Sequence, residues 1–379
     1  MADRETEVLA RIAPGVSAID AGHWDALTDG GDPFLGHAFL AALERSGSVG
    51  PGTGWSPATI LVEEEDALLA AAPAYLKSHS QGEYVFDHSW ADAYQRAGGA
   101  YYPKLQIAVP FTPVPGQRLL GSRPQQLLAA CEAVVLQHGL SSAHITFLDE
   151  NDAGQCEARG WLIRDGLQYH WFNRGYASFD DFLATLSSRK RKQIRKERRA
   201  ASDRLAFATL RGAEIGPPEW DAMWRFYQDT GSRKWGHPYL TRQFFDEIAA
   251  TMGDQLLLFL ALRDGRPVAG ALNLIGSQAL YGRYWGTIEE APFLHFELCY
   301  YRAIEWAIDH GLAQVQAGAQ GEHKLARGYE PVITRSAHFL ADPSLRAAVQ
   351  RYVEGERLAI ADEARWLAEA LPYRSSESE

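Results

Sequence analysis

Residues 138–161 read HGLSSAHITFLDENDAGQCEARGW, and residues 310–329 read HGLAQVQAGAQGEHKLARGY. Both stretches begin with His-Gly-Leu and end with Ala-Arg-Gly followed by an aromatic residue. The first motif recurs after 172 residues, from 138 to 310, and the second after 168 residues, from 158 to 326. Motifs that recur at almost the same offset indicate an internal duplication, so we expect two copies of one fold.

The segments around each His-Gly-Leu motif support the duplication. An apolar stripe at helical spacing precedes each motif, and a short strand-like segment (143–148 or 313–318) follows it. Gly139 and Gly311 suit the left-handed position that ends a helix. The stripes consist of Leu128, Cys131 and Val135 in the first half and of Leu298, Tyr301, Ile304 and Ile308 in the second.

Strand patterns further upstream also occur in both halves. Residues 59–78 and 256–276 each read as a strand, a polar turn and a second strand, and the second turn contains the hairpin signal Asp-Gly. Residues 279–286 (ALYGRYWG) supply a third strand, and we expect residues 84–91 (YVFDHSWA) to be its counterpart. The order of these elements predicts an α/β (α+β) fold in duplicate.

A helical segment separates the two halves. Residues 179–202 are helical by composition and spacing, and a second helix is expected to begin at Pro217-Pro218 and to end near Gly231. A third helix follows within residues 239–253. We therefore expect an N-terminal domain of residues 1–180 and a C-terminal domain of residues 181–379, which includes the basic helical segment 181–250.

Composition narrows the class of protein. The chain has 379 residues, 46% of them hydrophobic, a net charge of −11 and three cysteines. No apolar run is long enough to span a bilayer, the first residues do not resemble a signal peptide, and the cysteines do not have disulfide or zinc spacing. There is no Gly-x-Ser-x-Gly motif and no Walker loop. We expect a cytoplasmic protein with neither an integral membrane segment nor a metal site.

Residues 188–199 (SRKRKQIRKERR) are strongly basic although the chain is acidic overall. On a helix, Arg189, Lys192, Lys196 and Arg199 share one face, where like charges repel unless a polyanion is present. Candidate polyanions are the phosphates of coenzyme A, a tRNA acceptor stem and an anionic membrane surface. The alternative interpretation is an ordinary solvated helix face.

Several of these stretches resemble a known family. Residues 147–161 are similar to a strand-helix motif of the GNAT acyltransferase superfamily. The longer stretches 88–120, 187–199, 279–286 and 318–329 resemble a bacterial family of Fem-like predicted N-acyltransferases. The resemblance covers nearly the whole chain. It implies two tandem GNAT-like domains related by internal duplication, with a basic helical insertion between them.

The activated donor stays open between an acyl-CoA and an aminoacyl-tRNA, with no tightly bound cofactor. GNAT enzymes that hold coenzyme A carry Gln or Arg, two further residues and Gly-x-Gly or Gly-x-Ala before the central helix. Neither half has this pattern at that position, where the chain has residues 115–121 in the first half and 287–297 in the second. The residues expected to bind the donor are Arg189, Lys190, Lys192, Gln117 and Arg118.

Acyl transfer to an amine requires a proton acceptor and groups that stabilise an oxyanion. His295 and Glu297 are expected near a helix start, where an imidazole stays neutral more readily. Glu322 and His323 follow a strand, and the starts of helices and the carboxyl ends of strands meet on one side of an α/β sheet. We expect these four residues and Tyr284 to be catalytic. The alternative is that the charges of the loop 318–329 are merely solvated.

Other polar and aromatic residues are expected to bind the substrate. In the strand 279–286, alternation places Tyr281, Arg283 and Trp285 on one face and Tyr284 on the other, and its glycines mark a bulge or a close approach. Core packing is the alternative for the aromatic residues, and a buried His–carboxylate pair is the alternative for residues 84–91. The expected substrate-binding residues are Asp87, His88, Trp90, Tyr102, Lys104, Arg283, Trp285, Gln320 and Lys324.

Together these features predict an N-acyltransferase that moves an acyl or aminoacyl group from an activated donor to an amine. The amine would belong to a small molecule, an amino acid or a peptide, and tRNA is a candidate partner of residues 188–199. The alternative is a non-catalytic protein that binds peptidoglycan precursors or peptides.

Overall fold

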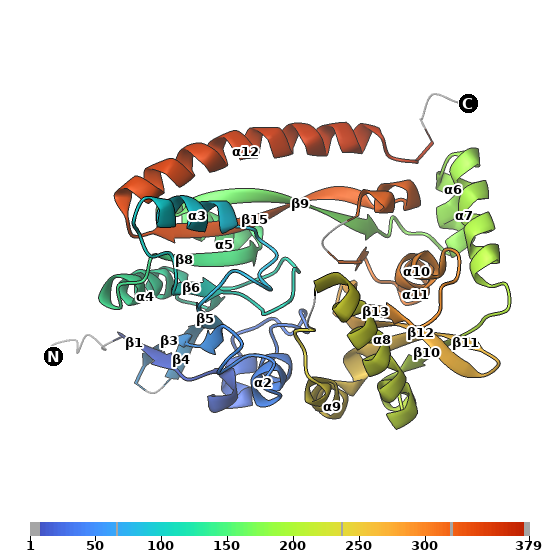
Figure 1. Ribbon diagram of the computed structural model, residues 1–379, viewed down its shortest axis with the longest axis horizontal. Helices are drawn as coiled ribbons and strands as arrows, with labels where there is room; N and C mark the ends of the chain where they lie inside the picture. Colours follow the sequence, from blue (N-terminus) through green and yellow to red (C-terminus); the bar gives the residue numbers. More distant parts are fainter. Residues whose placement is uncertain (1–7, 66, 236–237, 319–320, 375–379) are drawn as a thin grey trace, which may run out of the picture. The chain divides into compact units, whose positions relative to one another are not determined.

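The computed structural model describes residues 8–65, 67–235, 238–318 and 321–374. The chain forms two compact units (Figure 1). Unit 1 comprises Met1–Gly166 and Ile333–Asp362, and unit 2 comprises Leu167–Val332 and Glu363–Glu379. This division differs from the expected boundary at residue 180. The chain changes units within strands, because β9 (Leu162–Phe172) and β15 (Glu330–Leu340) each contribute residues to both.

Unit 1 contains two groups of paired strands. One has the order β1-β3-β4-β7, and the other has the order β15-β8-β6-β5-β2. The strands are β1 (Val8–Ala13), β2 (Trp55–Pro57), β3 (Thr59–Glu64), β4 (Ala67–Ala72), β5 (Ala74–Lys77), β6 (Lys104–Ile107), β7 (Leu120–Gly121) and β8 (Ser142–Leu148). The helices are η1 (Val16–Ala18), α1 (Ala21–Asp25), α2 (His37–Arg45), α3 (His88–Arg96), α4 (Pro124–Gln137) and α5 (Glu150–Ala158). The helix α12 (Pro343–Glu369) begins in unit 1.

The two faces of the second strand group in unit 1 differ in chemistry. Alternation along β6 and β8 puts Leu105 and Ile145 on one face, where they belong to the apolar core with residues of α4 and α5. The opposite face carries Lys104, Gln106 and His144, and these polar side chains are also buried. Covering a polar sheet face requires hydrogen-bonding partners, because unpaired polar groups are costly to bury.

Unit 2 follows the expected meander. Strands β10 to β13 pair antiparallel in chain order, β14 then pairs parallel with β13, and β9 completes the order β10-β11-β12-β13-β14-β9. The strands are β10 (Ala206–Arg211), β11 (Leu256–Arg263), β12 (Arg266–Ile275), β13 (Ala279–Thr287) and β14 (Gln314–Gln316). The helices are α6 (Phe179–Thr185), α7 (Ser188–Ala201), η2 (Gly212–Glu214), α8 (Pro217–Trp235), α9 (Arg242–Thr251), η3 (Gly253–Gln255), α10 (Leu294–Phe296), the π-helical turn η4 (Glu297–Tyr301), α11 (Arg302–Asp309) and η5 (Glu322–Arg327).

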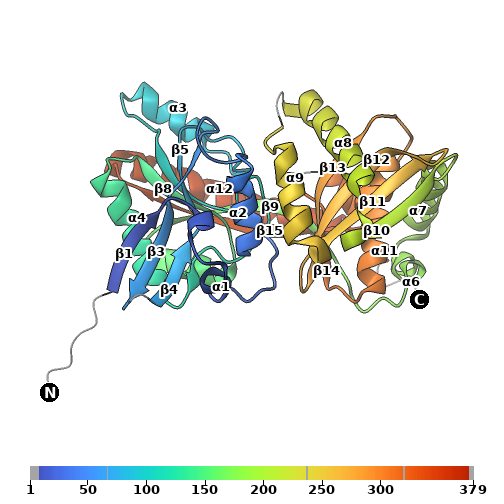
Figure 2. The same ribbon diagram turned by 90° about the horizontal axis from the view of Figure 1, so that it is seen from below.

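Helices cover both faces of the unit 2 sheet (Figure 2). Helices α6, α7 and α11 share one apolar core with the side of β11 and β12 that carries Leu257, Phe259 and Ala271. Helices α8 and α9 surround Tyr284 on the opposite side. The sheet is therefore buried on both faces, which explains the long apolar runs of its strands.

The backbone at the repeated glycines agrees with the duplication. Gly139 ends α4 with φ 62°, and Gly311 follows α11 with φ 67°. At the second motif, Gly160 and Gly328 have φ 84° and 86°, and each precedes the aromatic residue that leads into β9 or β15. Positive φ favours glycine at these helix ends, so the expected left-handed positions are confirmed.

The predictions for residues 84–91 and for residues 179–202 were wrong. Residues 84–91 do not form a strand, because α3 begins at His88 and the preceding carboxylate of Asp87 is buried against Lys104. The expected single helix 179–202 is two helices, since Leu186 is extended (ψ 156°) between α6 and α7. Local composition did not reveal either change.

The expected end of the next helix was also wrong. Helix α8 continues past Gly231, whose Cα lies against the ring of Pro238. A Cβ at this position would lie 3.0 Å from Cγ of that proline. Gly231 therefore allows close packing inside the helix rather than ending it.

A β-bulge corrects the expected faces of β13. Tyr284 pairs with Leu272 and Gly282 pairs with Asn273, so one extra residue lies between these pairs. Because of the bulge, Tyr281 and Tyr284 lie on the same face of β13, whereas the sequence predicted opposite faces. Trp285 lies on the opposite face.

Gly286 of β13 gives a test of how closely α8 packs on the sheet. Its Cα lies against the backbone of Phe226, and an added Cβ would overlap the Phe226 carbonyl oxygen. We expect Gly286→Ala to lower the free energy of unfolding by about 1–3 kcal/mol in urea denaturation, because the helix must move away. At the matched control Gly282→Ala the nearest atom is at an ordinary 3.4 Å. Equal effects of the two substitutions would contradict this packing.

Candidate functional site

In unit 2, His295 lies at the start of the helical segment α10–η4–α11, as expected. Its half-buried ring packs edge-on against Trp285 and Tyr300, with ring centroids 5.2 Å away in both cases. The aromatic neighbours come from β13 and from the π-helical turn, so the imidazole is held between the sheet and the helix.

His323 of η5 lies beside this imidazole. The ring centroids of His295 and His323 are 6.3 Å apart, and His323 Nε2 is 2.8 Å from the Tyr300 hydroxyl. Burial raises the pKa of Tyr300, so this phenol stays protonated. Gly321 has φ 117°, and a Cβ there would lie 2.5 Å from Cε1 of His323. A glycine at 321 is therefore needed for this ring position.

The neighbours of His323 in sequence have contrasting environments. Glu322 is exposed, whereas the side chain of Lys324 is fully buried and donates a hydrogen bond to the Gly318 carbonyl oxygen at 2.6 Å. Burial lowers the pKa of Lys324 to about 7. Burial and the nearby Lys324 lower the pKa of His170 to about 3, so this second imidazole is neutral at physiological pH. Gln320 lies outside the described residues.

Glu297 and Tyr284 are engaged within the fold of unit 2. The buried Glu297 carboxylate is 3.0 Å from Arg198 Nη2 and 3.2 Å from Arg302 Nε. Tyr284 is buried among aromatic residues of α8 and α9, and burial raises its pKa. The half-buried Arg283 guanidinium lies over the Tyr284 ring, 5.6 Å from its centroid. Proton transfer by Glu297 or Tyr284 would require breaking these arrangements.

The outer face of α7 carries cations. Arg189, Lys192, Lys196 and Arg199 are all exposed, as the helical spacing predicts, and Lys190 is half-buried. None of these five has an ion pair with any residue in the described ranges. The face therefore presents uncompensated positive charge to the solvent.

The inner face of α7 attaches the helix to unit 2. The buried Glu197 carboxylate accepts hydrogen bonds from Arg327 Nη2, at 2.9 Å, and from the Tyr301 hydroxyl. Arg198 bonds to both Glu297 and Glu305. In the sequence, Glu197 is the one acid of the basic stretch 188–199, and no role was predicted for it. Its position one turn from Ile194, on the apolar side of the helix, was the available signal.

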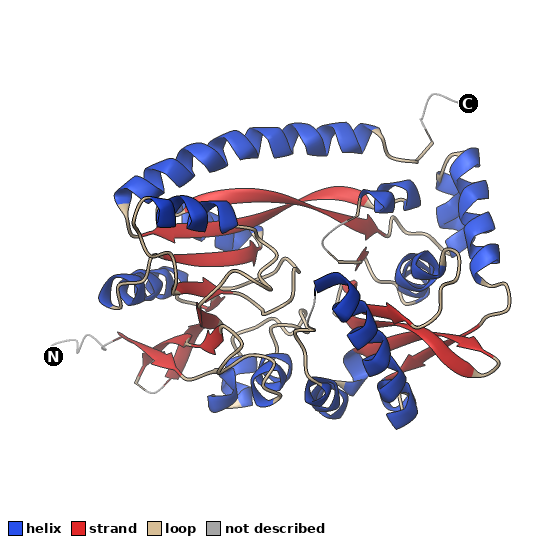
Figure 3. Ribbon diagram, in the orientation of Figure 1, coloured by secondary structure: helices blue, strands red, loops and turns tan. Residues whose placement is uncertain are grey.

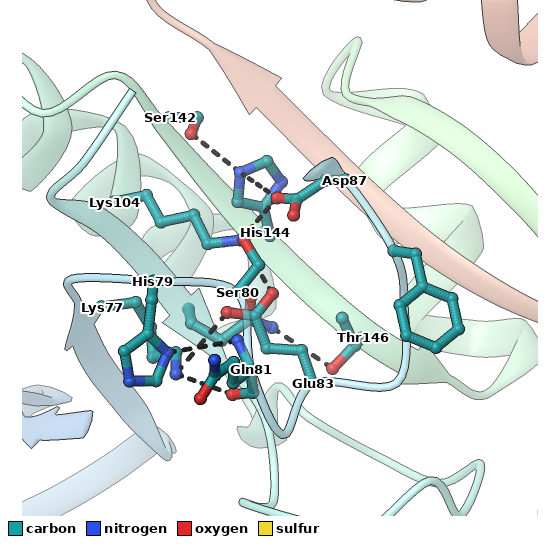
Figure 4. Close-up of polar contacts among 12 residues, drawn as sticks. Lys77, His79, Ser80, Gln81, Glu83, Asp87, Lys104, Ser142, His144 and Thr146 are labelled. Atoms are coloured by element: carbon teal, nitrogen blue, oxygen red, sulfur yellow. Dashed lines mark hydrogen bonds and ion pairs between the residues drawn. The ribbon is translucent and has the colours of Figure 1, made fainter. Parts of the chain in front are cut away.

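Unit 1 contains a second polar cluster, which is drawn in Figure 4. Lys104 Nζ lies 2.5 Å from Asp87 Oδ2, 2.7 Å from Glu83 Oε2 and 2.9 Å from Ser80 Oγ. Lys77, its cross-strand partner on β5, is 3.8 Å from Glu83 Oε1 and lies 3.6 Å from the centroid of the Trp55 ring. The side chains of these two lysines and two acids are almost completely buried.

Burial and mutual attraction set the charges of this cluster. Burial lowers the pKa of Lys77 to about 7 and raises the pKa of Glu83 to about 7. Burial acts to raise the pKa of Asp87, but the charge of Lys104 and its hydrogen bond hold it well below its usual range. Burial acts to lower the pKa of Lys104, and the two carboxylates overcome this and raise it. Lys104 and Asp87 therefore form a lasting ion pair.

Two histidines extend the cluster across the sheet. His144 Nδ1 and His338 Nδ1 are 2.7 Å apart on paired strands β8 and β15, so one must donate while the other accepts. Burial and Lys104 lower the pKa of His144 to about 3, and burial lowers that of His338 well below its usual value. Both imidazoles are neutral. Residues 143–148 were expected only as a short strand, so this pair was not predicted, although His144 alternates with Ser142 and Thr146.

The other expected residues of unit 1 have varied surroundings. Trp90 packs on His338 with centroids 4.9 Å apart, and the Tyr102 hydroxyl is 2.8 Å from Ser80 Oγ. His88 is exposed and stacks on Phe86.

The two residues of unit 1 that were expected to bind the donor make internal contacts. Arg118 is buried, and its guanidinium donates to the carbonyl oxygens of Thr146, Gln117 and Val114. The Gln117 amide donates to the Leu119 carbonyl oxygen at 2.9 Å. Both side chains therefore bind backbone atoms of unit 1.

Comparison with known proteins places the chain in a family. The sequence model of the FemAB-like family, described as peptidoglycan biosynthesis/recognition, matches residues 15–375. The chain belongs to the FemAB-like family. This result confirms the resemblance read from the motifs of the sequence. A search of curated proteins found no match.

Several solved structures share the fold of the chain. FemX has 13% sequence identity and a TM-score of 0.53, and the match covers 88% of this chain and 98% of that chain. The C-terminal domain (DUF2156) of a putative lysylphosphatidylglycerol synthetase from Agrobacterium fabrum has 11% identity and a TM-score of 0.52, with 89% and 97% covered. L-PGS from Bacillus licheniformis has 12% identity and a TM-score of 0.50, with 85% and 97% covered. These similarities confirm the expected fold class of two GNAT-like domains.

The described ranges contain neither a membrane-spanning helix nor a cluster of metal-binding side chains. No helix there combines the length and the apolar character needed to cross a bilayer. No group of three or more His, Cys, Asp and Glu side chains in the same ranges is placed to hold a metal ion.

The buried Lys324 predicts a pH-dependent stability. Its pKa is about 7 in the folded chain and its ordinary value is 10.5, so the unfolded chain binds more protons between these values. The burial cost is therefore complete below pH 7 and is relieved as the pH rises toward 10.5. We expect Lys324→Met to raise the free energy of unfolding relative to the parent chain. The increase should be larger at pH 6 than at pH 9.5, by on the order of 2 kcal/mol.

Urea denaturation at both pH values measures this difference. The control is Lys192→Met, which removes an exposed lysine of α7 and should give the same small change at both pH values. If the change in free energy of unfolding caused by Lys324→Met is the same at both pH values, burial does not destabilise the charged form of Lys324.

Proposed function

We propose that the FemAB-like chain is an N-acyltransferase that moves an aminoacyl group from an aminoacyl-tRNA to an amine of a peptidoglycan-precursor peptide. The observation that carries the proposal is the pair of adjacent imidazoles in unit 2, with Tyr300 bonded to His323. The family description and the printed name of one structural neighbour, FemX, support the reaction class.

His323 is the proposed proton acceptor. When its Nε2 carries the proton and donates to the Tyr300 oxygen, Nδ1 is the ring nitrogen that would accept a proton from an attacking amine. The amine nitrogen forms a bond to the ester carbonyl carbon as its proton passes to Nδ1. The carbon–oxygen bond to the ribose then breaks, and the proton passes from Nδ1 to the departing ribose oxygen. These reaction steps conserve protons and require neither a metal ion nor a redox partner.

The other members of the cluster have proposed supporting roles. His295 and Trp285 pack together and would form an aromatic wall for the acceptor. The exposed carboxylate of Glu322, next to His323, would attract the acceptor ammonium before its proton is removed. Lys324 holds Gly318 and so fixes the backbone that leads to η5.

The outer face of α7 supports tRNA as the donor. From Arg189 to Arg199 the helix rises about 15 Å, because each residue adds about 1.5 Å. A row of four cations over that length suits successive phosphates of an RNA strand better than the compact phosphates of one coenzyme A. The segments before the central helices, residues 115–121 and 287–297, also lack the coenzyme A pattern of Gln or Arg, two residues and Gly-x-Gly or Gly-x-Ala.

Substitution of His323 tests the chemical step. We expect His323→Gln to lower the rate of transfer from charged tRNA to a precursor peptide at least 100-fold, because general-base catalysis typically contributes 10²–10⁴-fold. The control His138→Gln changes an exposed histidine at the end of α4 and should retain the parent rate. Full activity of His323→Gln would refute this role.

Charge reversal on α7 tests the donor separately. We expect Lys192→Glu with Lys196→Glu to weaken tRNA binding at least tenfold in a filter-binding assay at low salt, because each phosphate contact adds electrostatic affinity. The control, Arg96→Glu with Arg351→Glu, reverses two exposed cations of α3 and α12. Product formation from acyl-CoA that survives RNase, with no transfer from charged tRNA, would instead favour a thioester donor.

A further inference from the structure

The polar sheet face of unit 1 contains an arrangement that acyl transfer in unit 2 does not use. Lys77 and Lys104 face each other on the paired strands β5 and β6, and both side chains are fully buried. Like charges directly opposite each other on a sheet are destabilising. Each ammonium group therefore needs an anionic partner, and both carboxylates that supply it come from the next segment of the chain.

That segment, residues 78–87, connects β5 to α3 without regular secondary structure (Figure 3). Glu83 and Asp87 point from it onto the two lysines, as Figure 4 shows. None of its hydrophobic side chains is buried, although the structure describes all ten residues, and Phe86 is 55% exposed. Polar contacts therefore hold the segment in place, where most buried loops use apolar anchors.

The carboxylates do not fill their own hydrogen-bonding capacity. Glu83 Oε1 and Asp87 Oδ1 are buried and have no hydrogen-bond partner. Glu83 Oε1 is 3.8 Å from Lys77 Nζ, which is too far for a hydrogen bond. A purely structural cluster would be expected to satisfy these atoms, because a partly satisfied buried network costs stability.

We infer that Lys77 and Lys104 form a binding site for a small dicarboxylate, and that Glu83 and Asp87 occupy this site as an internal competitor. The ligand's carboxylates would replace those of the segment at the same two ammonium groups. The hydroxyl of Tyr102, which lies outside the segment and now bonds to Ser80, would complete the coordination of the ligand. Displacement moves Glu83 and Asp87 away from the sheet face. It leaves the segment held by its other hydrogen bonds, among them Ser78 N–H to the Gly54 carbonyl oxygen and Arg164 to the Phe86 carbonyl oxygen.

The competition sets the apparent affinity. A ligand that binds only when the segment is displaced has its affinity reduced by the fraction of molecules in which the site is open. Glu83→Gln removes one competing charge while keeping the shape of the side chain, so the open fraction rises. Lys77→Met removes one of the two ammonium groups that form the proposed binding site.

Calorimetric titration with glutarate as the probe tests the inference. We expect Glu83→Gln to bind glutarate about tenfold more tightly than the parent and Lys77→Met to bind it at least tenfold more weakly. The control Glu157→Gln changes an exposed acid of α5 in the same unit and should match the parent. Unchanged or weaker binding by Glu83→Gln, or its failure to fold, would overturn the inference and leave the cluster as a structural element.

Hydrogen exchange on the unsubstituted chain provides a second readout that does not depend on variant folding. Saturating glutarate should speed amide exchange in peptides covering residues 78–87 and leave peptides of unit 2 unchanged. No acceleration would overturn the displacement. Acceleration by inorganic phosphate without any effect of glutarate would overturn the assignment of the ligand as a dicarboxylate.

Discussion

The carboxylate of Glu197 is the contact on which the arrangement of unit 2 depends. It lies on the inner face of a helix that otherwise carries cations, and it binds Arg327 of η5 and Tyr301 of the π-helical turn. Breaking such a buried pair leaves an uncompensated charge, which typically costs about 3–5 kcal/mol. One acid thus fixes which side of α7 faces inward. It connects the basic helix to the two segments that carry His295 and His323.

Unit 1 uses paired buried charges in a different way. Its lysines project from a sheet face, and the acids that neutralise them lie on an irregular segment with little apolar contact of its own. In unit 2 the ionic contacts supplement a large aromatic core around α6, α7 and α11. Similar pairs therefore have different consequences: those of unit 2 reinforce a packed helix, and those of unit 1 hold a segment that packing alone would not retain.

The duplication could be read from the sequence because its signals are local. Gly139 and Gly311 adopt positive φ wherever the rest of the chain lies, and the motifs around them recur at one offset. The predictions that were wrong concerned residues whose conformation depends on contacts with residues elsewhere in the sequence. The bulge in β13 depends on its register with β12, and the course of residues 84–87 depends on a lysine 17 residues further along. No local pattern contains that information.

The sequence by itself determined the duplicated α/β fold, the outward cations of α7 and the nearness of His295 to a helix start, since periodicity and glycine positions decide these features. Only the tertiary structure decided that His323 bonds to Tyr300, that Glu297 is paired with Arg198, and that Lys77 and Lys104 share a buried face with Glu83 and Asp87. These contacts join residues far apart along the chain, and burial then sets their charges. A side chain's protonation follows from what surrounds it in space, which its neighbours in sequence do not specify.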